Sequence, residues 1–277
     1  KNQYQTLNRS LIPQLAQNGL KLVRHHEDLT PKQAKYVDKY FEKDVYPVLT
    51  PMAVDSSRPF PLVRNKSLNI GALIYDKKKD VTDIATVQVP SVLPRIVRLP
   101  SEEKGVTEII LLEEVIEKNL DKLFLNYDIV CAYPYRIMRN ADFSIDEETA
   151  DLLKEIEKQL KQRQWGEVIR LEVDEAMDKK LLKELKKHLG VDDEGVYKIN
   201  GPLDLTFLMK VNGIDGFDHL KYPKYKPQPV PGMGDYSHIF DRIKKGDILL
   251  FHPYYEFTPV IEFIKQAAND PDVLAIK

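Results

Sequence analysis

Short apolar segments separated by prolines fill the middle of the chain and restrict its fold more than any other feature. They are rich in β-branched side chains, which is typical of strands. The predicted strands cover residues 67–76, 83–89, 95–99, 107–112, 127–138 and 168–173. Helical patterns at 113–124, 144–163 and 178–190 interrupt them without a regular alternation of strand and helix. This order predicts an α+β domain over residues 51–215.

Local signals fix several element ends in this region. Ser144 with Glu147 forms a capping box, Asp178 is an N-cap, and Gly190 ends the helix that Asp178 begins. In the strand at 168–173, the alternation predicts Ile169, Leu171 and Val173 on one face, opposite Arg170 and Glu172.

Two amphipathic helices precede the strands. Leu7, Leu11 and Leu15 predict a helix over residues 2–18. Thr30 and Gln33 predict a capping box for a second helix that ends near residue 45. No strand partner for these helices is evident, so we expect residues 1–50 to be the end of a helical domain that begins outside this sequence.

The last part of the chain has a different pattern. Prolines punctuate residues 211–246, which is typical of an extended connector. An apolar run at 247–251, a helix with Thr258 as N-cap and Pro259 as its first residue that ends at residue 268, and a second apolar run at 273–276 then predict a βαβ unit. We expect the sequence to stop inside this α/β domain.

Composition excludes several classes of protein. The formal net charge of −2 argues against a global polyanion-binding surface, so no nucleic-acid partner is expected, but the 41 Lys and Arg residues leave a local basic cleft open. The single cysteine, Cys131, excludes an internal disulfide and is expected to be a buried thiol. No apolar stretch approaches the ~20 residues of a transmembrane helix. A cytoplasmic location is expected, with peripheral attachment to the inner membrane as the alternative.

The predicted βαβ unit suggests a binding site. Ligands of parallel sheets lie beyond the carboxyl ends of the strands, where His252, Tyr254 and Lys277 are expected. The start of the helix at Thr258 points to the same edge and favours anions. These groups suit a phosphate-bearing ligand. In the alternative, His252 only caps the strand and Lys277 is solvated.

Other polar residues give weaker signals. His25 and His26 lie in a polar loop, and no histidine has a second His or Cys at the spacing of metal ligands. Arg95, Arg98, Arg136 and Arg139 alternate with apolar residues, so they either line a path for a polyanion or form the solvated face of strands.

Several segments read together resemble the bacterial polyphosphate kinase family. They are VLTPMAVD (48–55), RPFP (58–61), SLN (67–69), LPRIVRLP (93–100), YRIMRNAD (135–142), VIRLEV (168–173), NGPLDL (200–205), GDILLFHPY (246–254) and DPDVLAIK (270–277). Their order and spacing match over nearly the whole chain. The departures are Arg58, Asn140 and Phe251, which replace a His, an Asp and the first His of a common His-His-Pro-Tyr. The last departure leaves His252 as the better candidate for lining the site.

The resemblance implies a four-domain enzyme that reversibly transfers the terminal phosphate of ATP to inorganic polyphosphate through a phosphohistidine. Residues 1–50 would end the N-terminal helical domain, 51–215 would form the α+β head domain, and 216–277 would be the connector and the start of a phospholipase D-like catalytic domain. The family uses Mg²⁺ and is expected to be a homodimer or higher oligomer. The nucleophile and the Mg²⁺-linked residues are expected beyond this sequence, so no catalytic residue or metal ligand is assigned.

Three hypotheses follow. In the first, the chain is part of a polyphosphate kinase whose partners are ATP, ADP and polyphosphate, and is inactive alone. In the second, it is a non-catalytic dimerisation or scaffold module. In the third, it belongs to a phospholipase D-like phosphodiesterase.

Overall fold

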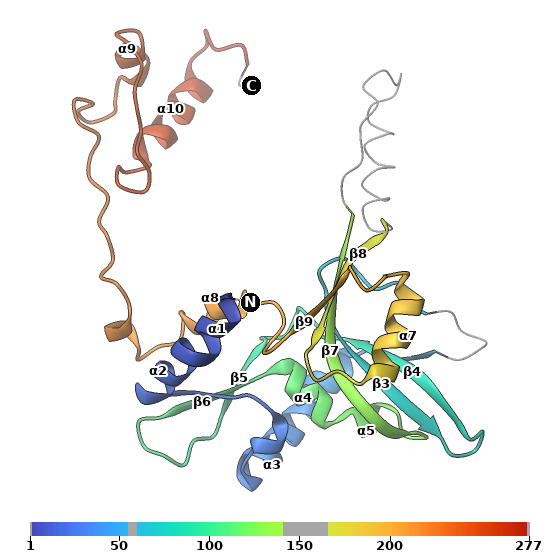
Figure 1. Cartoon of the computed structure of the whole chain (residues 1–277). Coiled ribbons are helices and arrows are strands. Elements are labelled where there is room, and N and C mark those ends of the chain that lie inside the picture. Colours follow the sequence, from blue (N-terminus) through green and yellow to red (C-terminus); the bar gives the residue numbers. More distant parts are fainter. Residues whose placement is uncertain (1, 55–59, 141–165, 276–277) are drawn as a thin grey trace, which may run out of the picture. The chain divides into compact units, whose positions relative to one another are not determined.

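A computed structural model describes residues 2–54, 60–140 and 166–275, which form two compact units, residues 2–213 and 214–275 (Figure 1). The predicted helix at 144–163, with its capping box, and Arg58 lie outside the described residues. No helix in the described ranges is long and apolar enough to cross a membrane.

The first unit combines two sheets with short helices. Its strands are β1 (Leu20–Val23), β2 (Met52–Val54), β3 (Leu68–Asp76), β4 (Val81–Gln88), β5 (Ile96–Leu99), β6 (Thr107–Leu111), β7 (Asp128–Arg139), β8 (Val168–Asp174) and β9 (Val196–Ile199). Its helical elements are α1 (Asn2–Thr6), η1 (Leu7–Leu11), α2 (Ile12–Gln17), η2 (His26–Asp28), α3 (Pro31–Tyr40), η3 (Phe41–Val45), η4 (Tyr46–Val48), α4 (Leu112–Lys118), α5 (Leu120–Leu123), α7 (Lys179–Leu189) and α8 (Phe207–Val211). The expected mixture of α and β structure is confirmed.

The larger sheet has the strand order β2-β4-β3-β7-β8-β9 and is antiparallel except for β8 and β9. Strand β3 lies between β4 and β7 and is buried on both faces because its side chains alternate between two cores. Ile70 and Ile74 belong to one core, whereas Leu73 belongs to the other. The sheet is therefore the middle layer of the unit.

Each face of this sheet is covered by different elements. Helix α7 buries Leu181 and Leu185 against one face, beside Tyr135 of β7. Helix α4 buries Val115 and Ile116 against the other face. The smaller sheet, in the order β1-β6-β5, contributes to the same core as α4. This arrangement places the loop after β1 next to α4.

Most predicted elements of the first unit are confirmed, and the exceptions have physical causes. The capping box of Thr30 and Gln33 and the N-cap of Asp178 are present. Ile169 does not share the buried face of Leu171 and is 55% exposed, because the pairing of β7 with β8 is irregular between Met138 and Arg139. Strands β1, β2 and β9 were not predicted, since their short segments carry no strong period of their own.

The helices before residue 50 are also confirmed, but they pack within the first unit. Strand β1 follows them and pairs in parallel with β6, and Phe41 is fully buried in the core that contains α4. Their assignment to a separate helical domain, and the domain boundaries at 50 and 215, stay predictions.

Three of the four alternating arginines, Arg95, Arg136 and Arg139, are engaged in hydrogen bonds within the unit, whereas Arg98 is exposed, as the solvated-face alternative expects. Arg95 donates through Nε and Nη2 to the Glu113 carboxylate, at 3.1 and 2.6 Å. Arg136 donates to Glu172 at 3.3 Å. Arg139 donates to backbone carbonyls, including that of Gly166 at 2.8 Å. These guanidinium groups hold strands and loops together.

The capping box supports a prediction about stability. Thr30 Oγ1 accepts a hydrogen bond from the Gln33 backbone N–H at 3.3 Å, and Gln33 Oε1 accepts one from the Thr30 N–H at 3.1 Å. We expect Thr30→Ala to lower the free energy of unfolding by about 1 kcal/mol, measured by urea denaturation. Thr6 makes no side-chain cap bond, so Thr6→Ala is the control and should cause no loss. Equal losses in the two variants would contradict the role of the cap.

The second unit contains η5 (Asp218–Leu220), α9 (Ile239–Ile243) and α10 (Thr258–Asn269). Its small core comprises Val230, Tyr236 and Ile239. A single parallel β-bridge joins Gln228 to Tyr255. This core holds α9 and the segment before α10 together.

The predicted βαβ unit is wrong as far as the described residues reach. Residues 247–251 and 273–275 are not strands, although the helix between them is present. Leu249 and Leu274 are 85% and 97% exposed. A strand needs at least one hydrogen-bonded neighbouring strand, and neither segment has one among the described residues. The apolar composition of these segments predicted strands, but composition alone does not show whether a neighbouring strand is present to pair with them.

Candidate functional site

His252 lies in the turn before α10, where its own hydrogen bond orients the ring. Nδ1 lies 3.1 Å from the backbone oxygen of Tyr255. Because a carbonyl can only accept, Nδ1 carries the proton and Nε2 is left to face a ligand. The Phe257 ring, 5.2 Å away between centroids, packs against the imidazole. The side chain is thus both exposed and oriented.

Tyr254 lies in the same turn and is 48% exposed. Its ring contacts those of Phe251, at 4.8 Å, and Tyr225, at 5.5 Å between centroids. The Tyr225 hydroxyl donates to the Tyr254 backbone oxygen at 3.3 Å. These contacts leave an exposed aromatic surface beside His252 in the sequence, with a phenol that can donate to an anion.

The start of α10 follows this turn, but its details differ from the prediction. The N-cap is Phe257, and Thr258 is the first helical residue. The Thr258 hydroxyl donates to Glu256 Oε2 at 3.1 Å and does not cap the helix. Lys277, the third predicted site residue, lies outside the described residues. The structure therefore places His252 and Tyr254 in one turn and leaves the position of Lys277 untested.

The first unit contains a cleft of about 910 Å³ that the sequence did not reveal. The loop after β1, helix α4, strand β7 and the segments after β8 and β9 line it. Its charged and histidine residues are Arg24, His25, His26, Glu27, Asp28, Glu113, Glu114, Glu117, Asp174 and Glu175. Carboxylates therefore outnumber basic groups among its lining residues.

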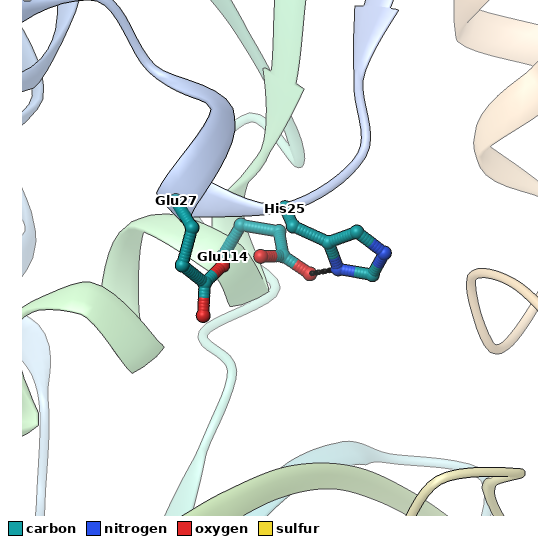
Figure 2. Close-up of side chains that lie close together, drawn as sticks. All are labelled: His25, Glu27 and Glu114. Atoms are coloured by element: carbon teal, nitrogen blue, oxygen red, sulfur yellow. Dashed lines mark ion pairs between the residues drawn. The ribbon is translucent and has the colours of Figure 1, made fainter.

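Glu114 reaches from α4 towards the loop after β1, as Figure 2 shows with His25 and Glu27. One carboxylate oxygen lies 3.9 Å from His25 Nδ1, and the other lies 3.4 Å from His26 Nδ1. The His26 backbone N–H also donates to Glu114 Oε2 at 3.0 Å. Glu114 thus ties the two histidines to α4.

Glu117 lies one helical turn beyond Glu114 and is the least satisfied group in the cleft. Its Oε1 is shielded from solvent and has no hydrogen-bond partner in the part of the chain that the structure describes. Burial, reinforced by the neighbouring carboxylates of Glu114 and Glu113, raises the pKa of the Glu117 carboxyl group well above its usual value.

His26, Glu114 and Glu117 place one ligand atom each within 4.8 Å of one another, as do His25, Glu27 and Glu114. Reasoning from spacing missed these groups because His26 and Glu114 are 88 residues apart in sequence. Only the packing of the β1 loop on α4 brings them together. Cys131 also lines the cleft, but burial raises the pKa of its thiol, which argues against an activated nucleophile.

Two family models match the chain in order. The model described as "Polyphosphate kinase middle domain" matches residues 32–211. The chain belongs to the polyphosphate kinase family. The model described as "Polyphosphate kinase C-terminal domain 1" matches residues 238–277. The resemblance inferred from the motifs is thereby confirmed.

Similar proteins support this family assignment. A polyphosphate kinase of Lactiplantibacillus plantarum is 48% identical over 100% of this chain and 38% of its own length. One from Pseudomonas aeruginosa is 36% identical over 99% of this chain and 40% of its own length. A solved polyphosphate kinase structure from Porphyromonas gingivalis is 22% identical, with a TM-score of 0.74 over 97% of this chain and 39% of that chain, and supports the fold. The chain thus spans about two fifths of these relatives.

The two candidate sites lie in parts of the chain that match different polyphosphate kinase domains. His252 and Tyr254 lie in the segment that matches C-terminal domain 1. Glu114 and Glu117 lie in the segment that matches the middle domain, whereas His25 and His26 precede it. The two sites therefore call for separate explanations.

Proposed function

We propose that the complete gene product is a polyphosphate kinase that reversibly transfers the terminal phosphate of ATP to a growing inorganic polyphosphate chain. The supporting observation is the match of two consecutive polyphosphate kinase domains in order along one chain. A phosphohistidine intermediate is part of this proposal, with the nucleophile outside the 277 residues. The chain alone is then expected not to turn over.

Within that enzyme, we propose that His252, Tyr254 and Lys277 bind the phosphate-bearing substrate. The free Nε2 of His252 can donate to a phosphate oxygen when the ring is protonated, since Nδ1 is held by Tyr255. The Tyr254 hydroxyl can donate as well, and Lys277 would add a positive charge. His252 has the strongest support because its ring is already oriented.

Mg²⁺ is a further part of the proposal, because metal ions neutralise the charge that develops during phosphoryl transfer. Mg²⁺ prefers several oxygen ligands in octahedral geometry. Among the described residues of the second unit, no three Asp, Glu, His or Cys side chains lie close enough together to hold an ion. None of these residues is therefore assigned to Mg²⁺, and no step is derived through it. A dimeric state, a phospholipase D-like catalytic domain and a cytoplasmic location stay predictions.

The proposal is tested by incubating the purified complete gene product with ATP and Mg²⁺ and measuring polyphosphate. We expect polyphosphate to accumulate, and ATP to form from ADP and added polyphosphate. A protein that does neither would refute the proposal. Cleavage of a phosphodiester without ATP would favour the phosphodiesterase alternative.

A further inference from the structure

The cleft of the first unit contains a half-buried glutamate with one oxygen that is shielded from solvent and has no partner among the described residues, and this feature calls for a ligand. Glu117 Oε1 is shielded from solvent and unpaired among the described residues. An ionised carboxylate is costly to bury unless it is paired with a charge or coordinates a metal. The family assignment gives this group no role, since the proposed phosphate site involves the second unit.

The surrounding groups have the geometry of cation ligands. Glu114 and Glu117 are three residues apart on α4 and therefore lie on one face of the helix. His26 Nδ1 is 3.4 Å from Glu114 Oε2. That separation suits two ligands of one tetrahedral ion, since Zn²⁺ binds nitrogen and oxygen at ~2.0–2.2 Å. One ligand atom each of His26, Glu114 and Glu117 lies within 4.8 Å of the others, so a small side-chain movement completes a set of three ligands.

The other nitrogen of His26 favours the tautomer that a metal requires. His26 Nε2 lies 3.5 Å from Glu27 Oε1. When an ion replaces the proton between Nδ1 and Glu114, a carboxylate beside Nε2 can accept the proton that the ring keeps on that nitrogen. Metal-bound histidines commonly give their second N–H to such a carboxylate. The sequence His26-Glu27 therefore supplies both a ligand and the group that orients it.

The excess of acidic residues in the cleft also favours a bound cation. Glu113 is neutralised by Arg95, but Glu114, Glu117 and Asp174 line the cleft with only Arg24 as a permanent cation among its lining residues. A bound cation would relieve the repulsion.

We propose that His26 Nδ1, Glu114 and Glu117 bind a divalent cation of the Zn²⁺ class. Imidazole and carboxylate together suit Zn²⁺ better than Mg²⁺ or Ca²⁺, which prefer oxygen ligands alone. Three protein ligands leave a fourth position to water or a small anion. The ion would link the loop after β1 to α4 and so stabilise the first unit. His25, 3.9 Å from the other Glu114 oxygen, can bind when that carboxylate turns.

The test is calorimetric titration of the chelator-treated complete gene product with ZnCl₂, without ATP or polyphosphate, so that it is independent of the proposed activity. We expect saturable binding of one Zn²⁺ per chain at this site and a higher melting temperature with Zn²⁺. His26→Ala and Glu117→Gln should each weaken that binding at least about tenfold and abolish the rise in melting temperature. Glu117→Gln keeps the side-chain volume and removes the carboxylate ligand, so folding should be retained.

The matched control is His188→Ala. His188 forms a comparable pair with Glu184, at 3.8 Å on α7, but lies outside the cleft. It should leave Zn²⁺ binding unchanged. Absence of binding to the unmodified protein, or binding that survives both His26→Ala and Glu117→Gln, would overturn the proposal and leave His26 as an ordinary ion-pair partner of Glu27 and Glu114.

Discussion

Replacing Arg95 with methionine is expected to lower the free energy of unfolding by about 3 kcal/mol. Its guanidinium donates to Glu113 through two nitrogens and to the Asp204 backbone oxygen at 2.7 Å. Removing one partner of a buried ion pair costs ~3–5 kcal/mol, because the remaining charge is left buried and unpaired. The lower end applies here, since the Glu113 side chain is only 4% exposed but that of Arg95 is 19% exposed.

The measurement is urea denaturation of the 277-residue chain followed by circular dichroism. Lys21→Met is the matched control, because Lys21 and Glu103 are also 2.6 Å apart but are 42% and 64% exposed. It should cause a much smaller loss, since water and salt screen exposed pairs. The double variant with Glu113→Met removes both buried charges and should recover part of the stability. An Arg95→Met variant no less stable than Lys21→Met would refute the role of burial.

This prediction also bears on whether the arginines of the first unit could bind a polyanion. Guanidinium groups that already satisfy buried carboxylates cannot bind a phosphate chain without exposing those carboxylates. Arg95 and Arg136 are engaged in this way. If the first unit contacts polyphosphate, exposed lysines are better candidates than these arginines.

The features that the sequence predicted correctly are those set by neighbouring residues. The capping box of Thr30 and Gln33 involves residues three apart, and Gly190 adopts the left-handed conformation that ends α7. The long strand β3 follows from a continuous apolar run. Such signals do not depend on the rest of the fold, so they can be interpreted before the fold is known.

What the sequence could not predict depends on distant partners. Ile169 continues the alternation of β8, but the irregular pairing with β7 turns it outward. The apolar run 247–251 has the composition of a strand but no ladder among the described residues. The meeting of His26 with Glu114 likewise follows from packing. Site residues assembled over such separations carry no spacing signal.

The largest expected effect on activity is that of His252. We expect His252→Ala to lower kcat/KM for polyphosphate synthesis by the complete gene product about 10- to 100-fold. A hydrogen bond to a charged group contributes ~1.5–3 kcal/mol, and each ~1.4 kcal/mol corresponds to a factor of ten in rate. The free Nε2 and the exposed position of the turn make this contact with a phosphate oxygen available.

Two further variants separate substrate contact from local structure. His252→Asn places an amide N–H near the position of Nδ1 and can keep the bond to the Tyr255 backbone oxygen, but it has no group at the position of Nε2. His252→Ala loses both the hydrogen bond to the Tyr255 backbone oxygen and the group at the position of Nε2. If His252 contacts phosphate, Asn and Ala should be similarly impaired while melting temperatures stay unchanged. If Asn restores full activity, the histidine only shapes the turn, and its proposed contact with substrate is wrong.

His238→Ala controls for the loss of any exposed histidine in the second unit. His238 precedes α9 and makes no side-chain cap bond, so kinetics should be unaffected. A separate variant concerns Phe251, which stands where the resembled family pattern has the first of two histidines. Phe251 packs on Tyr254. If His252 contacts substrate and residue 251 does not, Phe251→His should leave kcat/KM unchanged. A large gain in activity from Phe251→His would instead show that the first position also binds phosphate.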